Sequence, residues 1–143
     1  MGNRRIQHFV IDNQIEKLSD LAGKIEKLAE NWELSPTLAR KINLVIEEAF
    51  SNIVFYAYTD NDKHKINISV SLNNKRLTIE ITDDGIPFNP LAQQPPDTSL
   101  PVVERPVGGL GIFLISQIMD EMHYERKKNR NFLTLNKSIW YGH

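Results

Sequence analysis

The sequence predicts an α+β fold, a two-layer sandwich in which helices cover one face of a mixed, mainly antiparallel sheet. Two kinds of periodicity support this prediction: apolar residues recur every three or four positions in some segments and every second position in others. The alternating segments form two hairpins that precede or follow helices rather than alternating with them, which is typical of α+β proteins. The length of 143 residues is that of one domain.

The first elements are a strand and two helices. Residues 4–11 are expected to form a short strand. In residues 13–31 the apolar side chains have the spacing of an amphipathic helix, at Ile15, Leu18, Leu21, Ile25 and Leu28. Ser35 is a suitable N-cap, and Pro36 suits the first position of a helix because its missing N–H is not needed there. We expect that second helix to end near Tyr58.

A hairpin is expected next, with strands at residues 66–72 and 77–81 and a turn at Asn73-Asn74. Asp83 continues the alternation of the second strand, and residues two apart in a strand share a face. Asp83 is therefore expected to point between the sheet and the helices, where a carboxylate needs a hydrogen-bond donor. The donor is either the backbone of the following Asp-Gly turn or the amino group of a ligand ring.

Residues 85–111 hold six of the seven prolines and four of the seven glycines. A stretch of this length without regular structure is usually a functional lid or a linker. A third helix is expected over residues 108–122, and a closing hairpin over 124–127 and 131–137. Because the segments on both sides complete one fold, we interpret the stretch as a lid.

Composition excludes several classes of protein. The 17 Lys and Arg residues balance 18 Asp and Glu residues, which argues against a nucleic-acid-binding module. With no cysteine, the chain has no disulfide, no thiolate metal site and no cysteine nucleophile. No segment approaches the roughly 18 apolar residues of a membrane span, and the N-terminus does not look like a signal peptide. We expect a soluble, cytoplasmic protein.

The second helix carries polar residues beside its buried face. Its apolar stripe is formed by Leu38, Ile42, Val45, Ala49 and Tyr56. Glu48 and Asn52 are four residues apart and therefore neighbours on one flank of that stripe. They could hold Mg²⁺ through oxygen, or they could simply form an i,i+4 hydrogen bond. Phe50 and Val54 lie away from the stripe, which suggests a second covering surface such as a partner subunit.

Glycines open the expected third helix, at Gly108, Gly109 and Gly111. A glycine-rich helix N-terminus lets an anion approach free backbone N–H groups, although close helix packing would also explain it. The pattern is neither a Walker A motif nor a dinucleotide fingerprint. Together, the acid, the oxygen pair and the glycine-rich helix start favour binding of a Mg-nucleotide.

Three motifs in this order resemble the N, G1 and G2 boxes of the superfamily of gyrase, heat-shock chaperone, histidine-kinase and mismatch-repair ATPases. They are E-E-A-F-S-N at 47–52, D-D-G-I-P-F at 83–88 and G-G-L-G at 108–111. The chain is most similar to the anti-sigma factor serine kinases of that superfamily. The resemblance implies a Bergerat-type fold, with residues 1–143 forming a single histidine-kinase-like ATP-binding domain.

The resemblance also implies roles for particular residues. Asp83 would accept the adenine amino group, Gly85 would let the base lie against the backbone, and Asn52 would ligate Mg²⁺. Glu48 would be the general base that deprotonates a serine of a partner protein, an effect worth roughly 10²–10⁴ in rate.

The remaining implied roles concern the phosphates. Residues 88–107 would form the ATP lid, which we expect to gain protection from proteases when Mg-ATP binds. The glycines 108, 109 and 111 would hold the phosphates, and Arg105 would neutralise their charge or else pair with Glu104 in solvent.

The implied activity is that of an ATP-dependent serine kinase that sequesters a sigma factor and phosphorylates an antagonist protein. The alternatives are a nucleotide-binding module without kinase activity and a stand-alone histidine-kinase catalytic domain. Pro87 replaces the usual second glycine of the G1 box, which is expected to stiffen the turn and alter the base pocket. Glu48 favours the kinase, whereas Phe55 and Tyr56 stand where basic residues are frequent, which favours the module without kinase activity. A homodimer is expected if a second copy covers the far side of the second helix.

Overall fold

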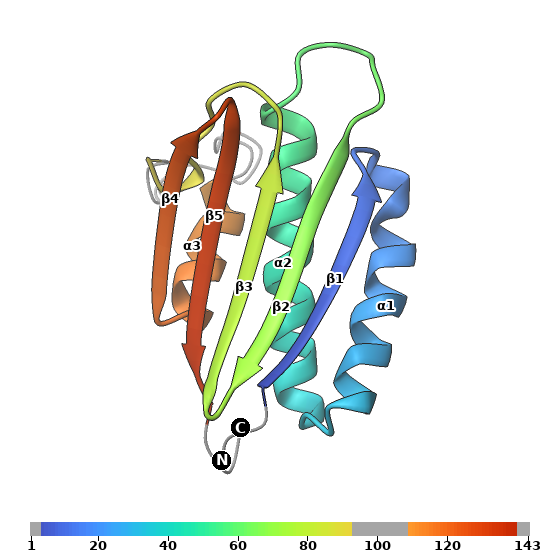
Figure 1. Cartoon of the computed structure of the whole chain (residues 1–143), viewed down its shortest axis with the longest axis vertical. Helices are drawn as coiled ribbons and strands as arrows, with labels where there is room; N and C mark the ends of the chain where they lie inside the picture. The colour runs from blue at the N-terminus through green and yellow to red at the C-terminus, as the bar shows by residue number, and fades with distance from the viewer. Residues whose placement is uncertain (1–3, 93–108, 140–143) are drawn as a thin grey trace.

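The computed structural model of the chain describes residues 4–92 and 109–139. Its five strands form one sheet in the order β1-β2-β3-β5-β4, and each of the four neighbouring pairs is antiparallel (Figure 1). The strands are β1 (Arg4–Asp12), β2 (Lys65–Asn73), β3 (Arg76–Asp83), β4 (Glu121–Lys127) and β5 (Arg130–Ser138). The α+β prediction is confirmed, with the difference that the described strands make an antiparallel sheet rather than a mixed one.

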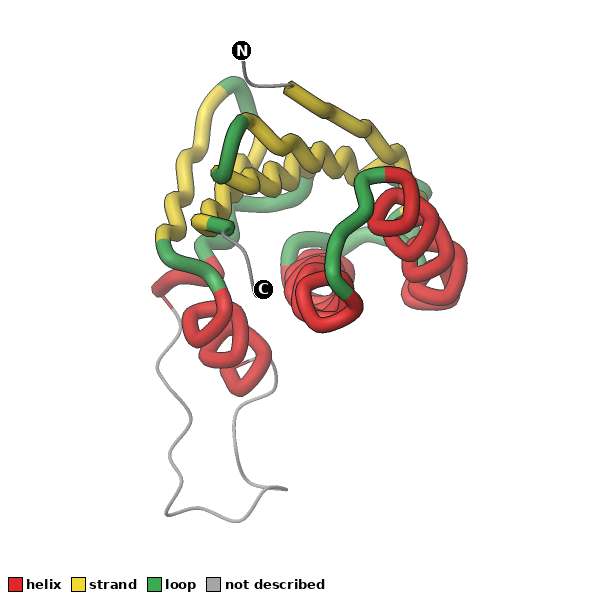
Figure 2. The backbone as a smooth tube through the Cα atoms, turned by 90° about the horizontal axis from the view of Figure 1, so that it is seen from below, coloured by secondary structure: helices red, strands yellow, loops and turns green. Residues whose placement is uncertain are grey.

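Three α-helices lie side by side against one face of the sheet, which makes two layers (Figure 2). They are α1 (Leu18–Asn31), α2 (Pro36–Tyr56) and α3 (Gly109–Ile118), and two short 3₁₀ turns are η1 (Ile15–Lys17) and η2 (Pro90–Ala92). The expected cap of α2 is present, because the Ser35 side chain accepts a hydrogen bond from the backbone N–H of Leu38 at 3.1 Å. None of the described helices is both long and apolar enough to cross a membrane.

The third helix ends at Ile118, earlier than the sequence suggested. The backbone N–H of Asp120 bonds the carbonyl of Asn136 at 2.9 Å, and β4 starts at the next residue. From Glu121 onward the side chains alternate between exposed and half-buried, which is the period of a strand. Apolar spacing in a short segment could not distinguish the end of the helix from the start of this strand.

The core lies between the sheet and the helix layer, with α2 in contact with both α1 and α3. Phe50 is 0% exposed and Val54 packs against the core, so the chain itself covers the side of α2 that suggested a partner subunit. That inference from the sequence was wrong, because Phe50 belongs to the core of this chain and Val54 packs against that core. The homodimer stays a prediction, but the apolar residues Phe50 and Val54 no longer support it.

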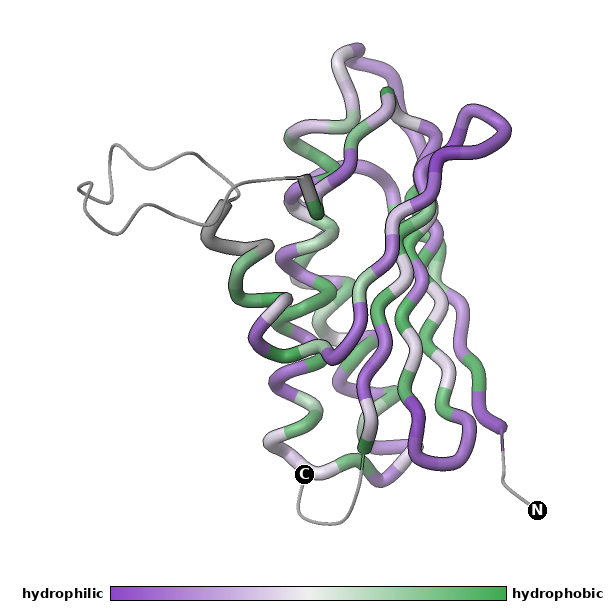
Figure 3. The backbone as a smooth tube through the Cα atoms, turned by 90° about the vertical axis from the view of Figure 1, so that its left-hand side faces the viewer, coloured by the Kyte–Doolittle hydropathy of each residue, from purple (hydrophilic) through white to green (hydrophobic). Residues whose placement is uncertain are grey.

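Strands β2 and β3 present alternate residues to the core, and hydrophobic and hydrophilic positions are interspersed along the strands of the sheet (Figure 3). The inward residues of β3, Leu77, Ile79 and Ile81, are fully buried. Asp83 follows them on the same face and is only 2% exposed. The prediction that this carboxylate points between the two layers is confirmed.

Candidate functional site

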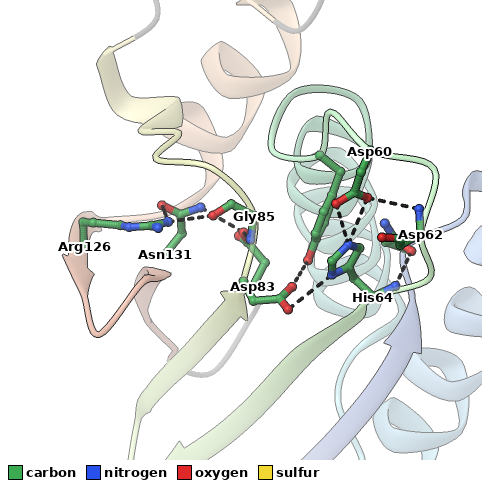
Figure 4. A network of polar contacts seen from close by, with 10 residues as sticks. Asp60, Asp62, His64, Asp83, Gly85, Arg126 and Asn131 are labelled. Carbon is green, nitrogen blue, oxygen red and sulfur yellow. Dashed lines mark hydrogen bonds and ion pairs between the residues drawn. The ribbon is translucent and has the colours of Figure 1, made fainter.

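The candidate site begins with Asp83, the last residue of β3. Its Oδ1 accepts hydrogen bonds from the backbone N–H of Gly85 at 2.9 Å and from Nδ2 of Asn131 at 2.8 Å (Figure 4). Among the described residues, no hydrogen bond reaches Oδ2. The turn interpretation of Asp83 is therefore correct for one oxygen, and the other oxygen is left for a ligand.

Asn131, which the sequence analysis missed, holds this region together. It lies on β5 directly opposite Asp83, and it is 3% exposed. Its Nδ2 also donates to the Ile86 carbonyl at 2.8 Å, and its Oδ1 accepts from the backbone N–H of Phe88 at 3.3 Å and from the Tyr124 hydroxyl. The sequence could have indicated this burial, because Asn131 lies two and four residues before Leu133 and Leu135 and therefore shares their face of strand β5.

Arg126 on β4 contacts the turn formed by residues 83–86 on the side where Asp83 and Asn131 lie, which we call the inner side of the turn. Its Nη1 donates to the Gly85 carbonyl at 2.8 Å and to Asn131 Oδ1 at 3.2 Å (Figure 4). Burial raises the pKa of Asp83, although the hydrogen bonds from Asn131 and Gly85 and the charge of Arg126 act in the opposite direction. The carboxylate is thus well oriented but poorly solvated, which suits the recognition of a ligand amino group.

Gly85 has a structural role that the sequence did not indicate. A Cβ at this position would lie 2.2 Å from the carbonyl oxygen of Ala57, just after α2. The same oxygen accepts a hydrogen bond from the backbone N–H of Ile86 at 2.7 Å. The side on which a Cβ would project is therefore filled by the residue that follows α2, and the glycine permits that contact. Its contact with an adenine base stays a prediction.

Glu48 and Asn52 lie on α2, as expected, but their hydrogen bond is not between side chains. Asn52 is 4% exposed, and its Nδ2 donates to the backbone carbonyl of Glu48 at 2.7 Å. A carbonyl can only accept, so this bond requires the amide nitrogen and directs the Asn52 oxygen elsewhere. The half-buried Glu48 carboxyl has a raised pKa, first because of burial and then because of the neighbouring Glu47.

Aromatic residues occupy the part of α2 where the superfamily often has basic ones. The ring of Tyr56 stacks on that of Phe88, with centroids 5.6 Å apart. Phe55 is 58% exposed. Tyr56 therefore packs against the first residue of the expected lid.

The phosphate end of the predicted site is only partly described. Arg105, Gly108 and residues 93–107 of the expected lid lie outside the described residues. Helix α3 begins at Gly109, and Gly111 lies in its first turn, as the motif predicted.

A second group of polar residues lies on the other side of the turn, which we call the outer side. It consists of Asp84, Tyr58, His64 and Asp60. Oδ1 of Asp84 accepts from the Tyr58 hydroxyl at 2.9 Å, and Oδ2 of Asp84 lies 3.2 Å from Nδ1 of His64. Nε2 of His64 lies 3.0 and 3.1 Å from the two oxygens of Asp60 (Figure 4). None of the motifs found in the sequence includes this histidine.

Comparison with known proteins agrees with this geometry. Residues 11–137 match the family described as the histidine kinase-like ATPase domain. An anti-sigma F factor of Clostridium novyi is 27% identical over 143 residues, covering 96% of this chain and 96% of that protein. A serine-protein kinase RsbW of Bacillus thuringiensis is 39% identical over 85 residues, which cover 57% of this chain and 52% of that protein.

Two further proteins are similar to this chain. The serine/threonine-protein kinase BtrW of Bordetella bronchiseptica is 27% identical over 108 residues, covering 76% of this chain and 75% of that protein. The structure of the histidine kinase AdeS of Acinetobacter baumannii covers 94% of this chain and 68% of that chain, with 16% identity and a TM-score of 0.48. The curated relatives confirm the resemblance to the anti-sigma factor serine kinases.

Proposed function

Because the chain belongs to the histidine kinase-like ATPase family, we propose that it is an ATP-dependent serine protein kinase that binds a sigma factor and phosphorylates an antagonist protein. The observation that supports this most directly is Asp83, a carboxylate that is 2% exposed and has one oxygen without a hydrogen bond among the described residues. A buried carboxylate with a raised pKa and one oxygen without a hydrogen bond costs stability, and a ligand would explain why it is kept.

The residues around Asp83 fit an adenine base. An adenine amino group is a donor, and Oδ2 of Asp83 is an acceptor without another partner among the described residues. Asn131 and the Gly85 N–H hold Oδ1, so they fix the orientation of the carboxylate before a ligand arrives. This preorganisation lowers the entropic cost of binding.

The α2 flank fits a magnesium ion. Magnesium prefers oxygen ligands and usually keeps several waters. The bond from Asn52 Nδ2 to the Glu48 carbonyl leaves the amide oxygen of Asn52 as the atom available to the metal. Mg²⁺ bound there would neutralise charge on the phosphates that ATP contributes to the reaction.

Glu48 is proposed as the general base. Its pKa is raised by burial, which makes the ionised carboxylate a better proton acceptor than a solvated glutamate. It would accept the proton of the substrate serine hydroxyl while that oxygen bonds to the γ-phosphorus of ATP and ADP leaves. Activity should accordingly fall as the pH drops through the raised pKa of Glu48.

The proposed phosphate-binding residues, partners and cellular location come from the resemblance to the family. Gly109 and Gly111, together with Gly108 and Arg105, would contact the phosphates, within one domain formed by residues 1–143. A sigma factor and an antagonist as partners would place the protein in the cytoplasm. One observation favours a second candidate, a binding module without kinase activity: Tyr56 and Phe55 provide no positive charge near the phosphates.

Nucleotide binding and phosphoryl transfer test the proposal separately. Isothermal titration calorimetry should detect Mg-ATP binding, and partners captured with immobilised protein in the presence of Mg-ATP should include a protein that becomes phosphorylated on serine. Glu48→Gln should retain ATP binding and lose transfer by about 10²–10⁴-fold. Glu47→Gln, the matched control, should retain both.

The possible outcomes separate the two candidates. ATP binding without phosphorylation of any captured protein would favour the binding module. Wild-type transfer by the Glu48→Gln variant would exclude Glu48 as the base. Absence of Mg-ATP binding would overturn both candidates.

A further inference from the structure

The polar group on the outer side of the turn is not explained by the proposed catalytic residues. Its central residue, His64, lies just before β2, and both of its ring nitrogens face carboxylates. A carboxylate at neutral pH can only accept hydrogen bonds. Both contacts are hydrogen bonds only when both nitrogens donate, and only the imidazolium form of histidine donates from both.

The neutral form of His64 would lose one of these two interactions. A neutral imidazole has one N–H and one lone pair, so either Asp60 or Asp84 would face a lone pair. Removing the charge would also remove the electrostatic attraction to both carboxylates. The His64 side chain is 21% exposed, compared with 50% for Asp60 and 42% for Asp84, so water weakens but does not eliminate the attraction.

The group is physically continuous with the base-binding turn. Asp84 lies between Asp83 and Gly85 in the chain, and one shallow groove is lined by His64 and Asp84 together with Gly85 and Arg126. The Tyr58 ring stacks on the His64 ring with centroids 4.6 Å apart and donates its hydroxyl to Asp84. The segment after α2 thus holds the outer carboxylate of the turn through two side chains.

We propose that His64 is a positioning residue whose imidazolium form holds the turn containing Asp83 in its ATP-binding geometry, so that nucleotide affinity decreases as His64 loses its proton. This inference rests on the proposed ATP site. Its chemical basis is the pair of carboxylates that face both ring nitrogens, which makes the interaction conditional on the charge of one histidine.

The charges around His64 determine the direction of the effect. Burial lowers the pKa of His64, but the carboxylates of Asp84 and Asp60 outweigh burial, and the pKa is raised above its ordinary value. A third carboxylate belongs to Asp62, and one of its oxygens lies within 4.8 Å of a ring nitrogen of His64 and of a carboxylate oxygen of Asp60. The cations that flank this region are Lys63 and Lys65 in the chain and Arg126 across the groove.

The other neighbours of His64 do not titrate in the same range. Burial raises the pKa of Tyr58, so its hydroxyl keeps its proton at neutral pH. From the loop after β1, Asn13 contributes only an amide oxygen, which accepts from the His64 backbone N–H at 2.9 Å. The stabilising contribution of His64 is complete below about pH 6.5 and is lost as the pH rises through the raised pKa.

The first test measures the turn without any nucleotide. Hydrogen-exchange protection factors of the Gly85 and Ile86 amides should fall about fivefold between about pH 6 and pH 9, after correction for intrinsic exchange. The fall should follow the ring-proton NMR titration of His64. His64→Gln should show the low protection at every pH, whereas His64→Lys, which keeps a cation, should show high protection throughout.

The second test measures affinity for Mg-ATP by calorimetry over the same range. The wild-type dissociation constant should increase about fivefold with the titration of His64, and neither variant should show this increase. His8→Gln, a matched change at an exposed histidine on β1, should behave as the wild type.

Each result has one interpretation. Protection factors that do not change with the titration of His64, or a His64→Gln variant with the wild-type pH profile, would overturn the inference. Protection that follows His64 while Mg-ATP does not bind at any pH would support the positioning of the turn and overturn the proposed ATP site instead.

Discussion

The turn at residues 83–86 joins two polar networks that use similar chemical groups in different surroundings. On the inner side, Asp83 and Asn131 are 2% and 3% exposed. On the outer side, the side chains of Asp84 and Asp60 are 42% and 50% exposed. Water can replace a lost partner on the outer side but not on the inner side, so the same deletion should cost much more inside.

This difference also separates what the two networks can do. The inner network is buried, and two hydrogen bonds orient one oxygen of the Asp83 carboxylate, as expected for a preorganised binding site. The outer network depends on the proton of one histidine, as expected for an adjustable support. Four substitutions test this comparison, in decreasing order of expected effect.

Asp83→Asn should have the largest effect, on ligand binding alone. The asparagine oxygen can still accept from Gly85 and Asn131, but the nitrogen that replaces Oδ2 cannot accept a hydrogen bond from an adenine amino group. We expect Mg-ATP affinity to decrease at least about 100-fold in calorimetry. Similar affinity in the variant would contradict the base-binding role.

The same variant should not be less stable. Because the folded-state pKa of Asp83 is raised, the ionised carboxylate opposes folding at neutral pH, and protonation on acidification relieves that cost. Asp83→Asn removes the buried charge, so its urea midpoint at neutral pH should equal or exceed that of the wild type. A purely structural Asp83 would give the opposite result.

Asn131→Ala should have the largest effect on stability. It removes one of the two donors to Asp83 Oδ1 and leaves the Ile86 carbonyl and the Tyr124 hydroxyl without their partner, which should cost about 3 kcal/mol of unfolding free energy. The matched control is Asn136→Ala on the same strand, where the half-buried amide accepts only the Thr78 hydroxyl among the described residues. That control should cost about 1 kcal/mol. Equal losses would contradict the central role of Asn131.

Gly85→Ala should be nearly as destabilising. The new methyl group would lie 2.2 Å from the Ala57 carbonyl oxygen, so the turn or the end of the α2 segment must move. We expect a loss of about 2 kcal/mol in urea unfolding. Gly23→Ala in α1 is the control: a Cβ there meets nothing within 4 Å, and helix propensity should add about 0.5–1 kcal/mol. A neutral Gly85→Ala would show that the contact is not required.

Tyr58→Phe should have the smallest effect, because it acts on the outer network. It removes the hydroxyl bonded to Asp84 and keeps the ring that stacks on His64. The expected loss is about 0.5 kcal/mol, measured as a shift in the urea midpoint. A loss as large as that of Asn131→Ala would mean that the two sides of the turn do not differ as proposed.

The arrangement of the site could be predicted from the sequence where the signal was local. The alternation of Leu77, Ile79 and Ile81 was sufficient to place Asp83 inside, and Ser35-Pro36 marked the start of α2. The partner of Asp83 was not predicted, because Asn131 lies 48 residues away and only the pairing of β3 with β5 brings the two together. His64 was missed for the same reason, since Asp84 is 20 residues away.

Local periodicity, a capping serine and three short motifs were thus enough to determine the fold class, most of the elements and the resemblance to a nucleotide-binding family, although not the boundary between α3 and β4. Tertiary structure decided which distant groups share an environment. It buried Phe50 in the chain's own core, placed the Ala57 carbonyl where a side chain on residue 85 would clash, and put a carboxylate beside each ring nitrogen of His64. The reason is physical. Secondary structure depends on neighbours within a few residues, whereas burial and hydrogen-bond pairing depend on which distant segments pack together.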